Sequence, residues 1–160
     1  MDQRVPMTPR GFTALKDELQ RIISEERPAN IKDIELALEH GDLKENAEYH
    51  AAKDKQGHIA ARMALIEDKI ARAEVIESAG QNPDKVRFGA TVGLSDVETD
   101  EKISYTIVGE DEADAKLSRI SVTSPVARAL MNKEVGDEVK VKVPKGTREL
   151  EVLEIRFDEL

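Results

Sequence analysis

The segment YHAAKDKQGHIAARMALIEDKIARA, residues 49–73, decides the fold of this chain. One seam runs through it at alternating steps of three and four residues, over Tyr49, Ala52, Gln56, Ile59, Met63, Ile66, Ile70 and Ala73. This spacing is the heptad repeat of a coiled-coil helix, and the other faces of the helix carry charged side chains. The sequence therefore predicts a long helix that packs along one side against a second helix.

The second helix is expected just upstream. Thr8 is placed to cap it, with Pro9 in the first turn. An apolar stripe then follows at helical spacing, over Phe12, Leu15, Leu19 and Ile22. The stripe falters near Pro28, which lacks a backbone N–H, and is expected to resume at Ile31, Ile34 and Leu38. Since only a short turn separates the two seams, they are predicted to form an antiparallel coiled-coil hairpin.

After Pro83 the apolar pattern changes to a period of two, which predicts strands. Their expected ranges are 86–94, 102–109, 119–122, 138–143 and 149–157. In the last range the apolar phase slips between Val152 and Leu153, which predicts a β-bulge or a strong bend. Ser124 is expected to cap a short helix that has Pro125 in its first turn.

These patterns predict an α+β protein. Residues 1–80 are expected to form the N-terminal coiled-coil domain, and residues 81–160 a small antiparallel β domain with one short helix.

Composition narrows the possible functions. The 160 residues carry a formal net charge of −9, which argues against general binding to a nucleic-acid backbone. There is no cysteine, and hence no disulfide or thiolate metal site. No apolar stretch has the length of a membrane span, and the first residues do not resemble a signal peptide. A cytoplasmic location is expected.

The turn between the helices is unusually acidic. In EHGDLKENAEYHAAK, residues 39–53, four carboxylates surround a single lysine in the turn: Glu39, Asp42, Glu45 and Glu48. The Asp42-x-x-Glu45 spacing is that of a helix capping box, and Asn46 is an alternative cap. Judged by pattern alone, capping is the favoured interpretation. Metal binding is the minority one, because two carboxylates hold a hard cation weakly unless other ligands complete the site.

Other side chains give weaker signals. His40, His50 and His58 lack the spacing of zinc ligands, and no serine has an evident base beside it. Basic residues of the second helix ordinarily form a solvated face, although they could meet RNA phosphates: Lys53, Lys55 and Arg62.

Several segments in both halves resemble one family in the right order. They are the acidic turn itself, PMTPRGFTALKDEL (6–19), FGATV (88–92) and YTIVGEDEADAKLSRISVTSPVARALMNKEVGDEVKVKVPKG (105–146). Over nearly the whole length, the chain resembles the bacterial Gre transcript-cleavage factors of the GreA type. The resemblance implies that the C-terminal domain is FKBP-like and binds RNA polymerase. It also implies that the coiled coil enters the secondary channel and reaches the 3′ end of backtracked RNA.

The same resemblance implies roles for individual residues. Asp42 and Glu45 would hold a weakly bound Mg²⁺ shared with the polymerase, in the manner of a two-metal site, and position the attacking water. Leu43, Lys44, Asn46 and Tyr49 would support the tip, and the basic residues Lys53, Lys55 and Arg62 would lie near the RNA. Ser121, Thr123, Ser124, Pro125 and Arg128 would dock on the polymerase.

The family resemblance implies an accessory factor that stimulates transcript cleavage by the polymerase and is not itself an enzyme. It implies neither independent sequence-specific DNA binding nor a membrane partner. Three rival functions stay open: a Gre-like inhibitor that occupies the channel without promoting cleavage, a prolyl isomerase, and a coiled-coil chaperone or scaffold.

Overall fold

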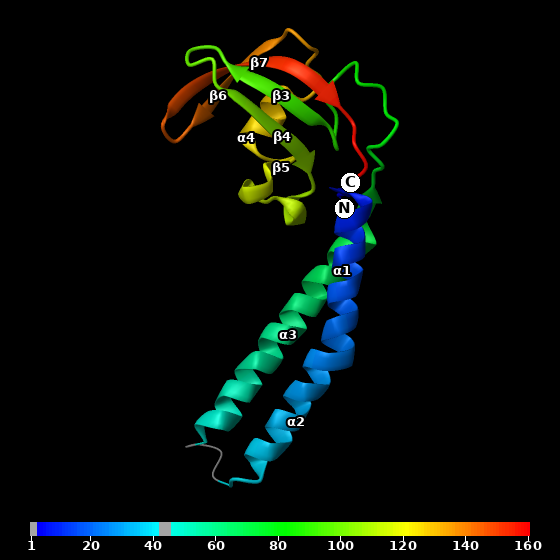
Figure 1. Cartoon of the computed structure of the whole chain (residues 1–160). Helices are drawn as coiled ribbons and strands as arrows, with labels where there is room; N and C mark the ends of the chain where they lie inside the picture. Colours follow the sequence, from blue (N-terminus) through cyan, green and yellow to red (C-terminus); the bar gives the residue numbers. More distant parts are fainter. Residues whose placement is uncertain (1–2, 42–45) are drawn as a thin grey trace. The chain divides into compact units, whose positions relative to one another are not determined.

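The computed structural model describes residues 3–41 and 46–160 (Figure 1). The contacts between residues divide the described chain into two compact units. One contains residues 3–12 and 73–160, and the other contains residues 13–72. The N-terminal residues thus group with the sheet, whereas the limits 1–80 and 81–160 stay a prediction of the sequence. The α+β class and the helical hairpin are as expected.

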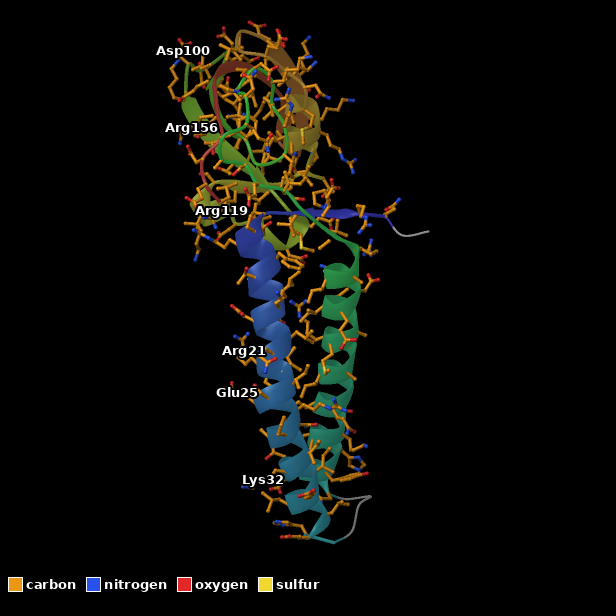
Figure 2. All side chains as sticks on the ribbon, turned by 90° about the vertical axis from the view of Figure 1, so that its right-hand side faces the viewer. Arg21, Glu25, Lys32, Asp100, Arg119 and Arg156 are labelled. Atoms are coloured by element: carbon orange, nitrogen blue, oxygen red, sulfur yellow. The ribbon has the colours of Figure 1, made fainter. Side chains whose placement is uncertain are left out.

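The hairpin consists of an ascending helix in three parts and a single descending helix. The ascending parts are α1 (Pro9–Arg21), a π-helical turn (Ile22–Glu26) and α2 (Arg27–Leu38). The descending helix is α3 (Ala47–Arg72). Thr8 caps α1 as predicted, because its Oγ1 accepts a hydrogen bond from the backbone N–H of Gly11 at 3.1 Å. Figure 2 shows that Arg21, Glu25 and Lys32 lie on the side of the ascending helix away from α3.

The π-helical turn changes which residues lie on the seam beyond Pro28. Arg27 N–H bonds to the carbonyl of Ile22, five residues back, which adds one residue to the turn just before the proline. From Leu15 onward, the residues buried on the ascending helix are therefore spaced at steps of seven, eight and seven: Leu15, Ile22, Asn30 and Ala37. The prediction that Ile31 and Leu38 continue the seam is wrong, and their side chains are 44% and 47% exposed.

The second unit is built on a five-stranded sheet with the order β5-β4-β3-β7-β6. Its strands are β3 (Thr91–Asp96), β4 (Lys102–Val108), β5 (Arg119–Ser121), β6 (Glu138–Val143) and β7 (Gly146–Arg156). All neighbours are antiparallel except β4 and β5, which pair in parallel at the edge. The helix α4 (Pro125–Leu130) contributes Ala127 and Leu130 to the buried core of the sheet (Figure 1).

The predicted irregularity of the last strand is confirmed. Gly93 pairs with Glu154 and Leu94 with Val152, so that Leu153 is left over as a β-bulge. The first strand, expected over 86–94, begins only at Thr91. Gly89 has φ +87 and forms a turn there, where a Cβ atom would come within 2.7 Å of the Ser78 Cβ.

Two short strands were not predicted. β1 (Val5–Met7) and β2 (Ala73–Val75) pair in parallel, with Val5 opposite Ala73. Beside them lies a one-turn 3₁₀ helix (Glu110–Glu112). The Glu112 carboxylate accepts hydrogen bonds from the backbone N–H groups of Thr8 and Gly109, both at 3.1 Å, and from the Thr8 hydroxyl. This contact holds residues 3–12 against the loop that precedes β5.

Candidate functional site

The candidate site is the turn that joins α2 to α3. α2 ends at Leu38, Gly41 has φ +93, and α3 begins at Ala47. Four of the predicted site residues, namely Asp42, Leu43, Lys44 and Glu45, lie outside the residues that the structure describes. The flanking residues Glu39 and Glu48 are exposed, so acidic side chains lie at both described edges of the turn.

Asn46 bonds to both helices of the turn. Its Nδ2 donates to the carbonyl oxygen of Ala37 at 2.7 Å, and its Oδ1 accepts from the backbone N–H of Tyr49 at 3.0 Å. The first bond reaches a carbonyl in the last turn of α2 that also accepts from the His40 N–H, and the second is the N-terminal cap of α3. Asn46 thus provides the cap, the alternative that the sequence left open.

Tyr49 is the other described residue of the predicted tip. Its side chain is half-buried in the first turn of α3. Its ring meets that of His50 edge-on, with ring centroids 5.6 Å apart and an interplanar angle of 69°. The part of the chain that the structure describes contains no cluster of three histidine or carboxylate side chains able to hold a metal ion.

The three predicted basic residues of α3 do not form one patch. Lys53 Nζ donates to Gln56 Oε1 at 2.7 Å and lines one groove of the hairpin. Lys55 lines a different groove together with Asp33, Leu36 and Glu48.

Arg62 is engaged within the hairpin itself. Its guanidinium donates two hydrogen bonds to Glu18, at 2.6 and 2.7 Å. The Arg62 hydrogen bond, assisted by the charges of Arg62 and Arg21, lowers the pKa of Glu18, although burial opposes this shift. Arg62 therefore helps to hold α1 to α3, and its charge is compensated.

The predicted docking segment, residues 121–128, forms a compact turn and helix. Ser121 Oγ and Thr123 Oγ1 are 2.7 Å apart, and Ser124 Oγ accepts from the Ala127 N–H at 3.2 Å as the predicted cap. Since Ala127 points into the core, the opposite side of α4 is free to face a partner. The exposed residues of the segment are Thr123, Pro125 and Arg128.

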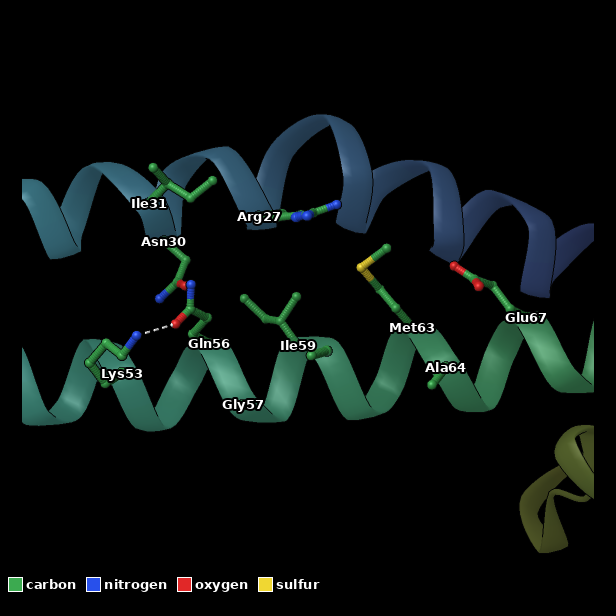
Figure 3. A pocket seen from close by; sticks show the side chains of 11 residues that line it. Arg27, Asn30, Ile31, Lys53, Gln56, Gly57, Ile59, Met63, Ala64 and Glu67 are labelled. Carbon is green, nitrogen blue, oxygen red and sulfur yellow. Dashed lines mark hydrogen bonds between the residues drawn. The ribbon is translucent and has the colours of Figure 1, made fainter.

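The sequence did not predict a groove of about 630 Å³ between α2 and α3 (Figure 3). Its lining includes Arg27, Asn30, Ile31, Ile59 and Met63. The one available signal was Pro28, where the apolar stripe falters, but the pattern does not reveal that an extra residue is accommodated there.

The chain matches two family models in order. Residues 5–75 match the family described as "Transcription elongation factor, N-terminal". Residues 81–157 match the family described as "Transcription elongation factor, GreA/GreB, C-term".

Curated relatives match over nearly the full length. The transcription elongation factor GreA of Trichlorobacter lovleyi is 53% identical over 158 residues, which cover 99% of this chain and 100% of that protein. The protein of the same name from Syntrophotalea carbinolica is 54% identical over 157 residues, which cover 98% and 99%. The crystal structure of GreA factor homolog 1 of Thermus thermophilus is 29% identical, covers 96% of this chain and 99% of that one, and has a TM-score of 0.44.

Proposed function

The chain belongs to the GreA/GreB family of transcription elongation factors, and we propose that it rescues stalled RNA polymerase by stimulating cleavage of backtracked RNA. The observation that carries the proposal is the near-complete match, above 50% identity, to proteins named transcription elongation factor GreA. Both halves match the family in order, so the proposal does not rest on one short motif. Cleavage chemistry belongs to the polymerase, and this chain acts as its accessory factor.

The acidic turn is the part that acts on the RNA. A chain of net charge −9 would be repelled by RNA phosphates unless cations lie between them. Asp42 and Glu45 supply carboxylate oxygens, which are the donors that Mg²⁺ prefers, and Mg²⁺ in proteins is often held by only one or two carboxylates. When bound, Mg²⁺ would stabilise charge on the attacking and leaving oxygens.

This chain's own residues place those carboxylates. Support comes from Asn46, which caps α3 and ties it to Ala37, so that both ends of the turn are fixed to helices. With the cap of α3 assigned to Asn46, we assign Asp42 and Glu45 to binding the cation and to orienting the attacking water by hydrogen bonds. Tyr49, in the first turn of α3, lines the base of the same tip.

The basic residues contribute unequally to this role. Lys53 and Lys55 are exposed and can meet the phosphates of the extruded 3′ end. Arg62 is held by Glu18 and serves the hairpin instead. Docking on the polymerase is assigned to the segment with Ser121, Thr123, Ser124, Pro125 and Arg128, where Thr123, Pro125 and Arg128 are exposed.

Localisation follows from the partner. A factor that acts on RNA polymerase works in the cytoplasm of a bacterial cell. Among the residues described, no helix is long and apolar enough to cross a membrane.

The decisive experiment uses purified RNA polymerase halted in a backtracked complex with 3′-labelled RNA. Wild-type chain with Mg²⁺ should release short labelled 3′ fragments and allow the polymerase to resume. Asp42→Asn and Glu45→Gln should reduce stimulated cleavage by at least about 100-fold while polymerase binding is retained. Variants that bind and cleave like wild type would refute the metal role. A wild-type chain that binds and blocks synthesis without cleavage would identify an inhibitor instead.

Docking is tested separately by competition between labelled wild-type chain and unlabelled variants for the polymerase. Pro125→Gly combined with Arg128→Ala should compete more weakly than wild type. Lys116→Ala, on an exposed residue outside the segment, is the matched control. Equal competition by the docking variant and the control would remove this assignment.

A further inference from the structure

The groove between α2 and α3 lies just beyond the π-helical turn, and Arg27, the residue that follows this turn, is part of its lining. In an uninterrupted helix Ile31, nine residues after Ile22, would face away from α3, and Ala29 would take the seam position after Leu15 and Ile22. The extra residue of the turn brings Asn30 into that position, with 2% exposure, and its Nδ2 donates to the Ala52 carbonyl at 2.9 Å. Ile31 is left at the lip of the groove, 44% exposed. π-helical turns within α-helices are frequent at functional sites. One physical reason is that such a turn rotates the residues that follow it.

The floor of the groove is apolar, and small residues form its rim on the α3 side. Ile59 and Met63 project from α3 toward α2 (Figure 3). Three exposed small residues follow one another at steps of three and four on α3: Gly57, Ala60 and Ala64. A Cβ atom added at Gly57 would meet nothing within 4 Å. Because these residues are small, the backbone of another helix can approach closely. A ridge of side chains on that helix can then lie in the groove.

The charged side chains that line the groove indicate what kind of helix it can bind. Arg27 lies across the opening from Met63, and its guanidinium has no hydrogen-bond or ion-pair partner among the described residues (Figure 3). Lys53, at one end of the groove, donates to the neutral amide of Gln56, whereas Glu67 lies at the other end. An acidic side chain on the occupant would pair with Arg27 in a partly desolvated position.

The lining disfavours RNA as the occupant. Recognition of single-stranded RNA relies on stacking of bases on aromatic rings or guanidinium planes, together with cations that follow the backbone. Arg27 offers one guanidinium plane and Lys53 one cation, but no aromatic side chain lines this groove, its floor is aliphatic, and Glu67 would repel a phosphate at one end.

We propose that this groove is a docking site for an amphipathic helix of RNA polymerase, whose apolar face covers Ile31, Ile59 and Met63 and whose carboxylate pairs with Arg27. The inference rests on the proposed function and adds a second contact, on the hairpin itself. Binding at the groove would hold the hairpin against the polymerase independently of the segment at residues 121–128.

The test measures competition of unlabelled variants with labelled wild-type chain for purified RNA polymerase. Ala60→Trp fills the groove, and Ala61→Trp places the same bulk on the next, exposed residue, outside the lining. Arg27→Glu reverses the charge, with Lys32→Glu as its control on the exposed side of α2. We expect about a tenfold loss of affinity for each groove variant and less than twofold for each control. Circular dichroism and thermal unfolding establish that the variants fold.

A photo-crosslinking residue at position 60 identifies the occupant in the complex with backtracked RNA. Crosslinks to a helical segment of a polymerase subunit support the proposal. Crosslinks to RNA, or to a second copy of this chain with a dimer detected by sedimentation, overturn it. If wild type binds and stimulates cleavage but both groove variants compete equally well, the groove inference fails and the proposed function stands. If wild type does not bind polymerase, both fail.

Discussion

Arg62 and Glu18 join α3 to α1 by two hydrogen bonds, Nε to Oε2 at 2.6 Å and Nη2 to Oε1 at 2.7 Å. They are 44 residues apart in the chain, and their side chains are 41% and 26% exposed. The pair is thus a tertiary contact within the hairpin. A basic residue that the sequence placed among RNA contacts therefore has a structural partner.

A double-mutant cycle measures the strength of this pair. Arg62→Met and Glu18→Gln should be coupled by about 0.5–1 kcal/mol in the free energy of urea unfolding, because the geometry is bidentate but solvent screens the charges. The pair Arg72–Asp68, one turn apart on α3, is the control and should give about 0.3–0.5 kcal/mol. A coupling of zero for Arg62 and Glu18 would contradict the predicted contribution of this pair to stability.

The same pair makes stability depend on pH. The lowered pKa of Glu18 means that the folded state binds its proton less readily than the unfolded state, whose value is near 4.5. Its contribution is therefore present above about pH 4.5 and is lost as pH falls through the lowered folded value. Thermal unfolding of wild type and Glu18→Gln should differ near pH 6 and converge toward pH 3. In an Arg62→Met background the difference should change less with pH, because only the charge of Arg21 then opposes the effect of burial on the pKa of Glu18.

Asn46 substitutions separate its two hydrogen bonds. Asn46→Ala should destabilise the chain by about 1–2 kcal/mol, because the cap of α3 and the bond to Ala37 are both lost. Asn46→Asp keeps an acceptor for the Tyr49 N–H but cannot donate to the Ala37 carbonyl, so it should cost less. Chemical unfolding measures both, and equal losses would contradict a cap at Asn46.

Deletions test the π-helical turn. Removal of Ser24 together with Pro28→Ala should leave the free energy of unfolding within about 1 kcal/mol of Pro28→Ala alone, because an uninterrupted helix then keeps Asn30 and Ala37 on the seam. Removal of Lys32 turns all later residues of α2 by about 100° and should cost more than about 2 kcal/mol. Similar losses from the two deletions would refute an extra residue at the turn.

Two glycine substitutions should have opposite effects. Gly109→Ala places a Cβ atom 2.7 Å from the Pro6 carbonyl oxygen, which cannot move without disturbing β1, and should cost about 1–3 kcal/mol. Gly57→Ala meets no atom within 4 Å in an exposed helix and should stabilise by about 0.5–1 kcal/mol. Melting temperatures of the two variants give the sign directly, and a stabilised Gly109→Ala would exclude the close approach to β1.

The sequence predicted the elements whose signals are local. Strand β6 has the expected bounds, Ser124 caps α4, and Leu153 is the residue left over in β7. Each of these depends on a periodicity or a cap within a few residues, which tertiary contacts strengthen but do not create. The short strands β1 and β2 were not predicted, because three residues carry no periodic pattern and their pairing joins segments about 70 residues apart.

The candidate site was predicted only as a motif. The acidic turn, its carboxylates and its likeness to a family are properties of the chain order alone. The chain order alone does not tell which side chain caps α3, because Asp42 and Asn46 fit the same pattern. The hydrogen bonds of Asn46 with Ala37 and Tyr49 identify Asn46 as the cap.

The amino-acid order by itself determined two helices that fold back on each other, a β domain after them, and an acidic turn between the helices, since hydrophobic period and turn composition are local. Tertiary structure alone decided which faces of the helices meet. One extra residue accommodated before Pro28 rotates everything after it, so that Asn30 instead of Ala29 takes the buried seam position and Ile31 lies at the lip of the groove. Packing against α3 selects that rotation, and no spacing within α2 encodes it.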